Sequence, residues 1–106
     1  MKSYNAKELS GLTGLSLSTI YYYQRRGLID YTKEGGRVFY SERGAEELQL
    51  ITELRGFNIS SGEIERLIKV RRVWGSRSSQ FGNAYSAVLK KRREELDRLK
   101  KDLESV

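Results

Sequence analysis

The sequence predicts a mainly α-helical chain, a winged helix-turn-helix with four helices and a β-hairpin wing, followed by a C-terminal coiled-coil helix. Three observations carry this prediction. Residues 5–27 contain two short helical patterns separated by a glycine turn. Residues 31–40 contain two β-prone runs around a Gly-Gly pair. Residues 85–106 repeat apolar side chains in steps of three and four, which is the spacing of a heptad seam.

The first helix is predicted to begin after Asn5, which is followed three residues later by Glu8. This pair has the spacing of a capping box. The helix runs to about Leu12, and Gly14 supplies a left-handed turn. Ser16 is then in place to cap a second helix.

The second helix, residues 16–27, carries hydroxyls, phenols and guanidinium groups. Neighbouring residues on a helix diverge by about 100°, so the three adjacent tyrosines cannot all face a core. An outward face of this kind is typical of a recognition helix that enters a DNA groove. A plain helical hairpin is the alternative. In either case the two helices are predicted to share an apolar packing seam of Leu9, Leu15, Ile20 and Tyr23, with Ser10 where they cross.

Behind this helix, two β-prone runs flank Glu34-Gly35-Gly36 and predict a hairpin. A hairpin that follows a helix-turn-helix is a wing. Lys33 and Arg37 lie beside its turn, where they could reach DNA phosphates.

A third helix is predicted to begin at Ser41 and to end at 56–57. Its apolar positions are Ala45, Leu48, Ile51 and Leu54. Its other face is expected to be acidic and to point away from DNA, with Glu42, Glu46, Glu47 and Glu53.

Ser60 and Glu63 predict the start of a fourth helix, which Val73 and Trp74 are expected to close as core residues. One face of this helix is basic, and either a solvated face or a phosphate-contacting face would explain it. The basic residues are Arg66, Lys69, Arg71 and Arg72.

Residues 75–79 are predicted as a linker between a DNA-binding domain, 1–74, and a dimerisation helix, 80–106. The narrow stripe of the last helix favours pairing with a second copy, and folding back on the domain is the alternative. Arg92 interrupts the stripe and is interpreted as a register device. The predicted dimerisation residues are Tyr85, Leu89, Leu96, Leu99 and Leu103, with Val106 ending the seam.

The composition limits the functions that the chain can have. The net charge is +6 and the pI is 9.7, which suits a polyanionic partner. The chain has no histidine and no cysteine, so the commonest general base and the usual soft-metal ligands are absent. We therefore expect no enzyme, no cofactor and no metal site. No apolar run is long enough for a membrane span, so a cytoplasmic, nucleoid-associated protein is expected.

Residues 19–29 and 36–41 resemble the MerR family of bacterial transcriptional regulators. The matching positions are Thr19, Tyr22, Tyr23, Gly27, Leu28, Gly36 and Tyr40. Tyr21, Gln24, Tyr31 and Gly44 depart from the family pattern, which has arginine, an acid, proline and aspartate there. The resemblance covers about residues 4–74.

The resemblance implies a regulator that binds a two-fold operator in double-stranded DNA as a homodimer, with RNA polymerase as a candidate partner. An excisionase-like or architectural DNA-bending factor and a coiled-coil adaptor without gene control are the alternatives. The residues expected to contact DNA are Ser16, Ser18, Thr19, Tyr22, Tyr23, Arg25, Arg26, Lys33, Arg37 and Tyr40.

Overall fold

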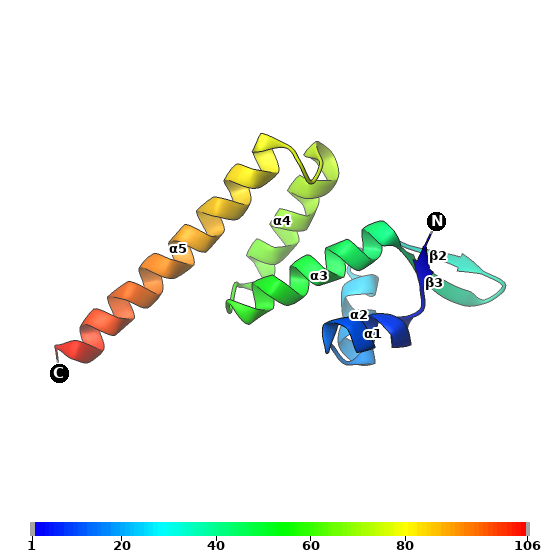
Figure 1. Ribbon diagram of the computed structural model, residues 1–106, viewed down its shortest axis with the longest axis horizontal. Helices are drawn as coiled ribbons and strands as arrows, with labels where there is room; N and C mark the ends of the chain where they lie inside the picture. Colours follow the sequence, from blue (N-terminus) through cyan, green and yellow to red (C-terminus); the bar gives the residue numbers. More distant parts are fainter. Residues whose placement is uncertain (1, 106) are drawn as a thin grey trace. The chain divides into compact units, whose positions relative to one another are not determined.

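The computed structural model describes residues 2–105, and within that range it contains five helices and a small three-stranded sheet (Figure 1). The predicted mainly α-helical winged helix-turn-helix with a long C-terminal helix is confirmed. The elements are β1 Ser3–Tyr4, α1 Ala6–Thr13, α2 Leu17–Arg25, β2 Tyr31–Glu34, β3 Arg37–Ser41, α3 Glu42–Gly56, α4 Ser61–Trp74 and α5 Ser79–Glu104.

The chain forms two compact units, which divide between Gly56 and Phe57. The first unit contains α1–α3 and the sheet, and the second contains α4 and α5. The predicted boundary was at residue 74. The division lies earlier in the chain because α4 packs against α5, so that both helices belong to the second unit.

Helices α1 and α2 each begin after a capping side chain that the sequence predicts. Asn5 Oδ1 accepts a hydrogen bond from the Glu8 amide at 2.8 Å, and Glu8 accepts one from the Asn5 amide at 3.2 Å. Gly14 ends α1 with φ +77°, and Ser16 Oγ accepts from the Thr19 amide at 3.2 Å. These contacts confirm the predicted capping box, glycine turn and second cap.

The predicted wing is an antiparallel hairpin in which Lys33 lies opposite Val38 and Glu34 lies opposite Arg37. A third strand, β1, pairs with the outer edge of β3 through Tyr4 and Tyr40. The sequence analysis missed β1, because two residues are too few to show alternation and their pairing depends on a distant segment.

The interior of the first unit holds the predicted packing residues of α1–α3. Leu9, Ile20 and Tyr23 are buried, and Leu15 is half-buried. Ser10 Oγ donates to the Leu15 carbonyl at 2.6 Å, where a small residue was predicted. The apolar residues of α3 that are fully buried include Leu48, Ile51 and Leu54.

The second unit is a helical hairpin, with α4 joined to α5 by a short turn (Figure 1). Ser60 Oγ accepts from the Glu63 amide at 3.3 Å and confirms the predicted start of α4. The prediction that Val73 and Trp74 close α4 as core residues is wrong, since their exposed fractions are 76% and 57%. They occupy the last turn of α4, beyond the buried residues Ile64, Leu67 and Ile68 of that helix.

Only the first part of α5 packs within the second unit. Val88 is buried there, at a position that the predicted seam did not include. Arg92 Nε donates to the Phe57 carbonyl at 3.0 Å, and Arg92 Nη1 pairs with Glu95 at 3.2 Å. Arg92 therefore links α5 to the first residue of the second unit by a hydrogen bond within one chain. Val106, the last predicted seam position, lies outside the described residues.

Among residues 2–105, no helix is long and apolar enough to cross a membrane. The same part of the chain contains no group of three or more acidic side chains placed to hold a metal ion.

Candidate nucleic-acid interface

The start of α2 presents a cluster of hydroxyl groups. Ser16 Oγ lies 3.1 Å from Ser18 Oγ and 2.8 Å from Thr19 Oγ1. Ser16 and Ser18 are exposed, and Thr19 is half-buried. Hydroxyls can donate or accept, so this cluster can pair with either a phosphate oxygen or a base edge.

Further along the same helix, Tyr22 and Arg26 form an exposed pair. The guanidinium carbon of Arg26 lies 5.7 Å from the centre of the Tyr22 ring, within cation–π range. The Tyr22 ring also packs edge-on against Tyr23, with centroids 5.2 Å apart. Arg25, the last residue of α2, is exposed. The C-terminal end of α2, with its cap residue Arg26, thus offers two cations and one oriented phenol.

Tyr23 and Tyr40, both predicted to contact DNA, are buried. Their exposed fractions are 6% and 0%. The Tyr23 hydroxyl accepts from Arg55 Nη1 at 2.9 Å, which joins α2 to α3. The Tyr40 hydroxyl donates to the side-chain oxygen of Gln24, which joins β3 to α2. Both tyrosines therefore link α2 to its neighbouring elements from the interior of the unit.

Burial raises the pKa of Tyr40 to about 12, with smaller contributions from the phenols of Tyr21 and Tyr31. A phenol is protonated at neutral pH, and the raised pKa of Tyr40 extends to higher pH the range over which its hydroxyl can donate to Gln24. The neutral amide oxygen of Gln24 suits a neutral phenol donor.

The wing presents its cations beside its turn. Lys33 and Arg37 are both exposed, on β2 and β3. Gly35 and Gly36 form the turn with φ +55° and +79°, a combination that only glycine adopts readily. The chain can therefore reverse within two residues and place both cations near the tip.

Between α2 and the wing lies a groove of about 400 Å³. Tyr21, exposed by 40%, lines it from α2, and Arg37 lines it from β3. Lys7 from α1 completes a cationic border. The groove is a concave surface on the first unit with a basic edge, which suits a nucleic-acid backbone.

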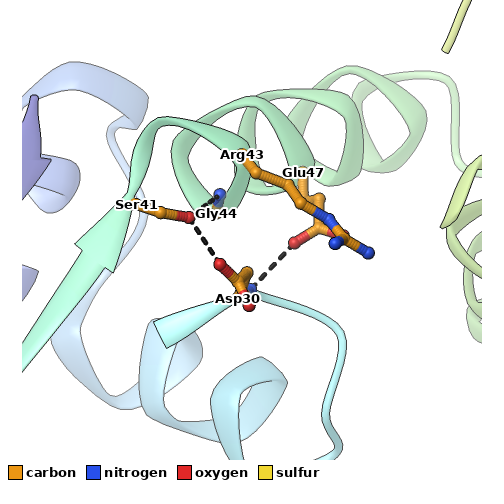
Figure 2. Close-up of polar contacts among 5 residues, drawn as sticks. All are labelled: Asp30, Ser41, Arg43, Gly44 and Glu47. Carbon is orange, nitrogen blue, oxygen red and sulfur yellow. Dashed lines mark hydrogen bonds and ion pairs between the residues drawn. The ribbon is translucent and has the colours of Figure 1, made fainter. Parts of the chain in front are cut away.

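A partly buried polar network links the base of the wing to α3 (Figure 2). The Asp30 amide donates to Glu47 Oε1 at 2.8 Å, and Ser41 Oγ donates to Asp30 Oδ2 at 2.7 Å. The Gly44 amide in turn donates to Ser41 Oγ at 3.0 Å. These bonds tie the segment before β2 to the first turns of α3, so the hairpin leaves the domain in one direction.

Glu47 corrects the prediction that it belongs to a solvated acidic face. Its exposed fraction is 0%, and Arg43 Nε lies 3.7 Å from its second carboxylate oxygen. A buried carboxylate needs hydrogen bonds and a cation to offset lost hydration. Asp30 and Arg43 supply them.

Gly44 was noted only as a departure from the family pattern, and the structure supplies the reason. A Cβ at position 44 would lie 2.2 Å from the Asp30 carbonyl oxygen, far inside van der Waals contact. The sequence analysis missed this close approach and the partners Asp30 and Glu47. The one available signal was a glycine near the start of a predicted helix, which usually has a packing reason.

The predicted dimerisation residues lie along α5 with increasing exposure toward its end. Tyr85 and Leu89 are half-buried, and the Tyr85 ring packs 5.9 Å from that of Phe81. Leu96, Leu99 and Leu103 are exposed by 47%, 56% and 70%. Phe57, Leu89 and Leu96 line an apolar groove of about 250 Å³ in the second unit.

Comparison with known proteins gives consistent matches. The family model described as "MerR HTH family regulatory protein" matches residues 4–70. Comparison with curated proteins gives no significant match.

Three solved structures are similar in fold over nearly the whole chain. HiNmlR, a MerR family regulator lacking the sensor domain and bound to promoter DNA, has a TM-score of 0.71 and 17% identity, with 97% of this chain and 80% of HiNmlR covered. A putative MerR family transcriptional regulator from Listeria monocytogenes has a TM-score of 0.67 and 25% identity, with 96% and 76% covered. The transcription regulator PbrR691 from Ralstonia metallidurans CH34, in complex with lead(II), has a TM-score of 0.60 and 21% identity, with 96% and 84% covered.

Proposed function

The chain belongs to the MerR family of transcriptional regulators and contains its helix-turn-helix DNA-binding domain, and we propose that it binds a two-fold operator as a homodimer. The observation that carries this proposal is the exposed face of α2. This face combines the hydroxyl cluster, Tyr22 and two arginines on a helix whose other side is buried. The similar fold of HiNmlR, which is bound to promoter DNA, supports promoter DNA as the target.

In this proposal α2 lies in the major groove and reads base edges. Ser18, Thr19 and Tyr22 face the bases, and Ser16 contacts a phosphate at the helix start. Arg25 and Arg26 lie at the other end of the helix, where a guanidinium can pair with guanine or with phosphate. A good base-edge pair contributes about 1–3 kcal/mol of discrimination.

The wing supplies contacts that do not depend on sequence. Lys33 and Arg37 are exposed at the hairpin tip and are proposed to pair with phosphates on the flank of the site. Tyr23 and Tyr40 act indirectly. Through Arg55 and Gln24 they hold α2 against α3 and β3, so that helix and wing approach the duplex in a fixed relation.

The exposed leucines of α5 support the homodimer. One recognition helix reads only a few base pairs, which cannot stand out against the many non-specific sites of a genome. Two copies joined through α5 would read two half-sites separated by about one helical turn or a multiple of it. Residues 1–74 then act as the DNA-binding part, 75–79 as the linker, and 80–106 as the dimerisation helix.

The proposed DNA target also bears on the protein's partner and on its location within the cell. A promoter-bound regulator works beside RNA polymerase, which we propose as a partner in the same assembly. Since the target is genomic DNA, the proposed location is the bacterial nucleoid in the cytoplasm.

Selection of bound sites from a random DNA pool tests the proposal. The wild-type chain should enrich a short inverted repeat, and Ser18→Ala and Tyr22→Phe should each change the enriched bases at defined positions. Ser86→Ala, an exposed serine on α5, is the matched control and should leave the motif unchanged. An unchanged motif in both α2 variants would refute the assignment of the recognition helix. Enrichment of tandem repeats in place of an inverted repeat would favour an architectural role.

A further inference from the structure

The first unit carries a second concave surface, which the DNA-binding proposal does not use. It lies between α1 and α3 and has a volume of about 560 Å³. We call it the α1–α3 groove. Apolar groups of Tyr4, Leu9, Leu12 and Ala45 line one part of it.

Leu12 is the unusual member of this lining. Its exposed fraction is 71%, whereas Leu9, one turn earlier on the same helix, is exposed by 1%. Removing an exposed leucine side chain from water is favourable through the hydrophobic effect. Leu12 therefore offers a contact that the isolated unit leaves unused, at the edge of a preformed hollow.

The α3 lining of the groove also carries three carboxylates and one amide. Glu42, Glu46, Gln49 and Glu53 line it from α3, at successive spacings of four, three and four residues. This spacing places them in one row on a helix. All four are exposed. The row spans about 16 Å, or three helical turns, at 1.5 Å per residue.

This acidic row is set on a chain whose net charge is +6. Within residues 2–105, neither Glu42 nor Glu53 makes an ion pair. The carboxylates at the two ends of the row are thus available to external cations.

The groove does not fit nucleic acid. Its carboxylates would repel phosphates, and none of the ten residues predicted to contact DNA lines it. An apolar hollow with an acidic border is complementary to a surface that combines apolar and basic side chains. The length of the acidic row matches a partner segment of about three helical turns.

We propose that the α1–α3 groove binds a basic amphipathic helix of another protein while α2 and the wing remain free for DNA. Apolar side chains of the partner helix pack against Leu12 and Ala45. Its lysines or arginines, on one face of the helix, pair with Glu42 and Glu53 at the two ends of the row. This surface adds a protein-binding function to the DNA-binding unit.

The test uses the full chain, labelled with ¹⁵N, and a synthetic 14-residue peptide of leucine and lysine arranged to form a basic amphipathic helix. We expect amide shift changes concentrated in α1 and α3. Glu42→Gln/Glu53→Gln should weaken peptide binding about tenfold, and Leu12→Ser should weaken it by a similar factor. A peptide with glutamate in place of each lysine should not bind.

The matched control is Glu94→Gln/Asp97→Gln, which removes the same charge from exposed positions on α5. It should bind the peptide as the wild type does. Equal weakening by the control would show non-specific charge attraction and overturn the proposal. Shift changes confined to α5, or shifts in α1 and α3 that appear on self-association without peptide, would also overturn it. The groove variants should bind selected DNA normally, so this outcome is separate from that of the DNA-binding proposal.

Discussion

The first unit and the distal half of α5 differ in the burial of their apolar side chains. In the first unit Leu9, Ile20 and Leu48 are exposed by 1% or less. Along the end of α5, Leu99 and Leu103 are exposed by 56% and 70%. Both regions contain regularly spaced leucine or isoleucine, so the periodicity is similar while the burial is opposite.

This difference indicates that the two regions depend on different partners. The first unit closes a core from its own helices and strands and can hold α2 and the wing in place. Isolated helices are marginal in water, and residues 96–105 at the end of α5 are all exposed. In the proposed homodimer these leucines would pack against a second helix, and complete burial would contribute about 1.5–3 kcal/mol for each side chain.

The largest expected effect comes from placing charge on the exposed leucines. Leu96→Asp/Leu99→Asp should convert the proposed dimer to a monomer, because two carboxylates cannot be buried between paired helices without partners. Specific DNA affinity should then fall by orders of magnitude, since a monomer reads one half-site. Analytical ultracentrifugation and DNA titration measure the two effects.

Asn83→Asp/Ser86→Asp adds the same charge to exposed positions of α5 and is the control. It should remain dimeric. If the leucine variant still sediments as a dimer, the seam lies elsewhere. If it becomes monomeric and keeps its operator affinity, the two half-site mechanism fails.

The next effect tests the closed core of the first unit. Gly44→Ala places a Cβ 2.2 Å from the Asp30 carbonyl oxygen, so either the start of α3 or the base of the wing must shift. Overpacking of this kind typically costs about 1–3 kcal/mol. The free energy of unfolding, measured with urea, should fall by that amount.

Gly11→Ala is the matched control, because a Cβ at position 11 in α1 meets nothing within 4 Å. It should stabilise the unit by about 0.5–1 kcal/mol through helix propensity. Equal destabilisation by both variants would contradict the close approach at position 44.

Local signals made the helix starts and the hairpin predictable from sequence. Asn5, Ser16 and Ser60 each act within three residues of themselves, and the Gly35-Gly36 turn needs no distant partner. Strong local patterns of this kind carry their information in a short window.

The features that could not be predicted depend on distant residues. The strand β1 forms by pairing with β3. The buried carboxylate of Glu47 accepts a hydrogen bond from the amide of Asp30, which lies 17 residues away in the sequence. Periodicity also failed at Trp74, where an apolar residue remains exposed. In the candidate site, the exposed residues of α2 follow from helix geometry, whereas the burial of Tyr40 follows from three-dimensional packing.

A smaller effect is expected at the wing. Lys33→Ala/Arg37→Ala should weaken DNA binding evenly across sequences, because phosphate contacts carry no base information. The slope of log affinity against log salt should decrease by about 0.9 for each phosphate contact removed. Fluorescence anisotropy at several salt concentrations measures it. Lys90→Ala/Lys91→Ala, which removes two exposed cations from α5, is the control and should retain the wild-type slope. An unaltered slope in the Lys33→Ala/Arg37→Ala variant would exclude phosphate contacts by the wing.

The smallest effect concerns Tyr40, which is buried in the first unit and has a pKa raised to about 12 by burial. In the unfolded chain a tyrosine has a pKa of about 10, so between these values the unfolded state releases a proton that the folded state retains. Stability should therefore fall as pH rises from 10 toward 12, by about 1 kcal/mol at pH 11 from this group. Tyr40→Phe should be less stable than the wild type at pH 8, because Gln24 loses its donor, and the difference should narrow at pH 11. Urea unfolding at both pH values measures this. Tyr22→Phe, which alters an exposed phenol, is the control and should show the same decline as the wild type. If the free energies of unfolding of the wild type and Tyr40→Phe differ by the same amount at pH 8 and pH 11, Tyr40 titrates normally in the folded state.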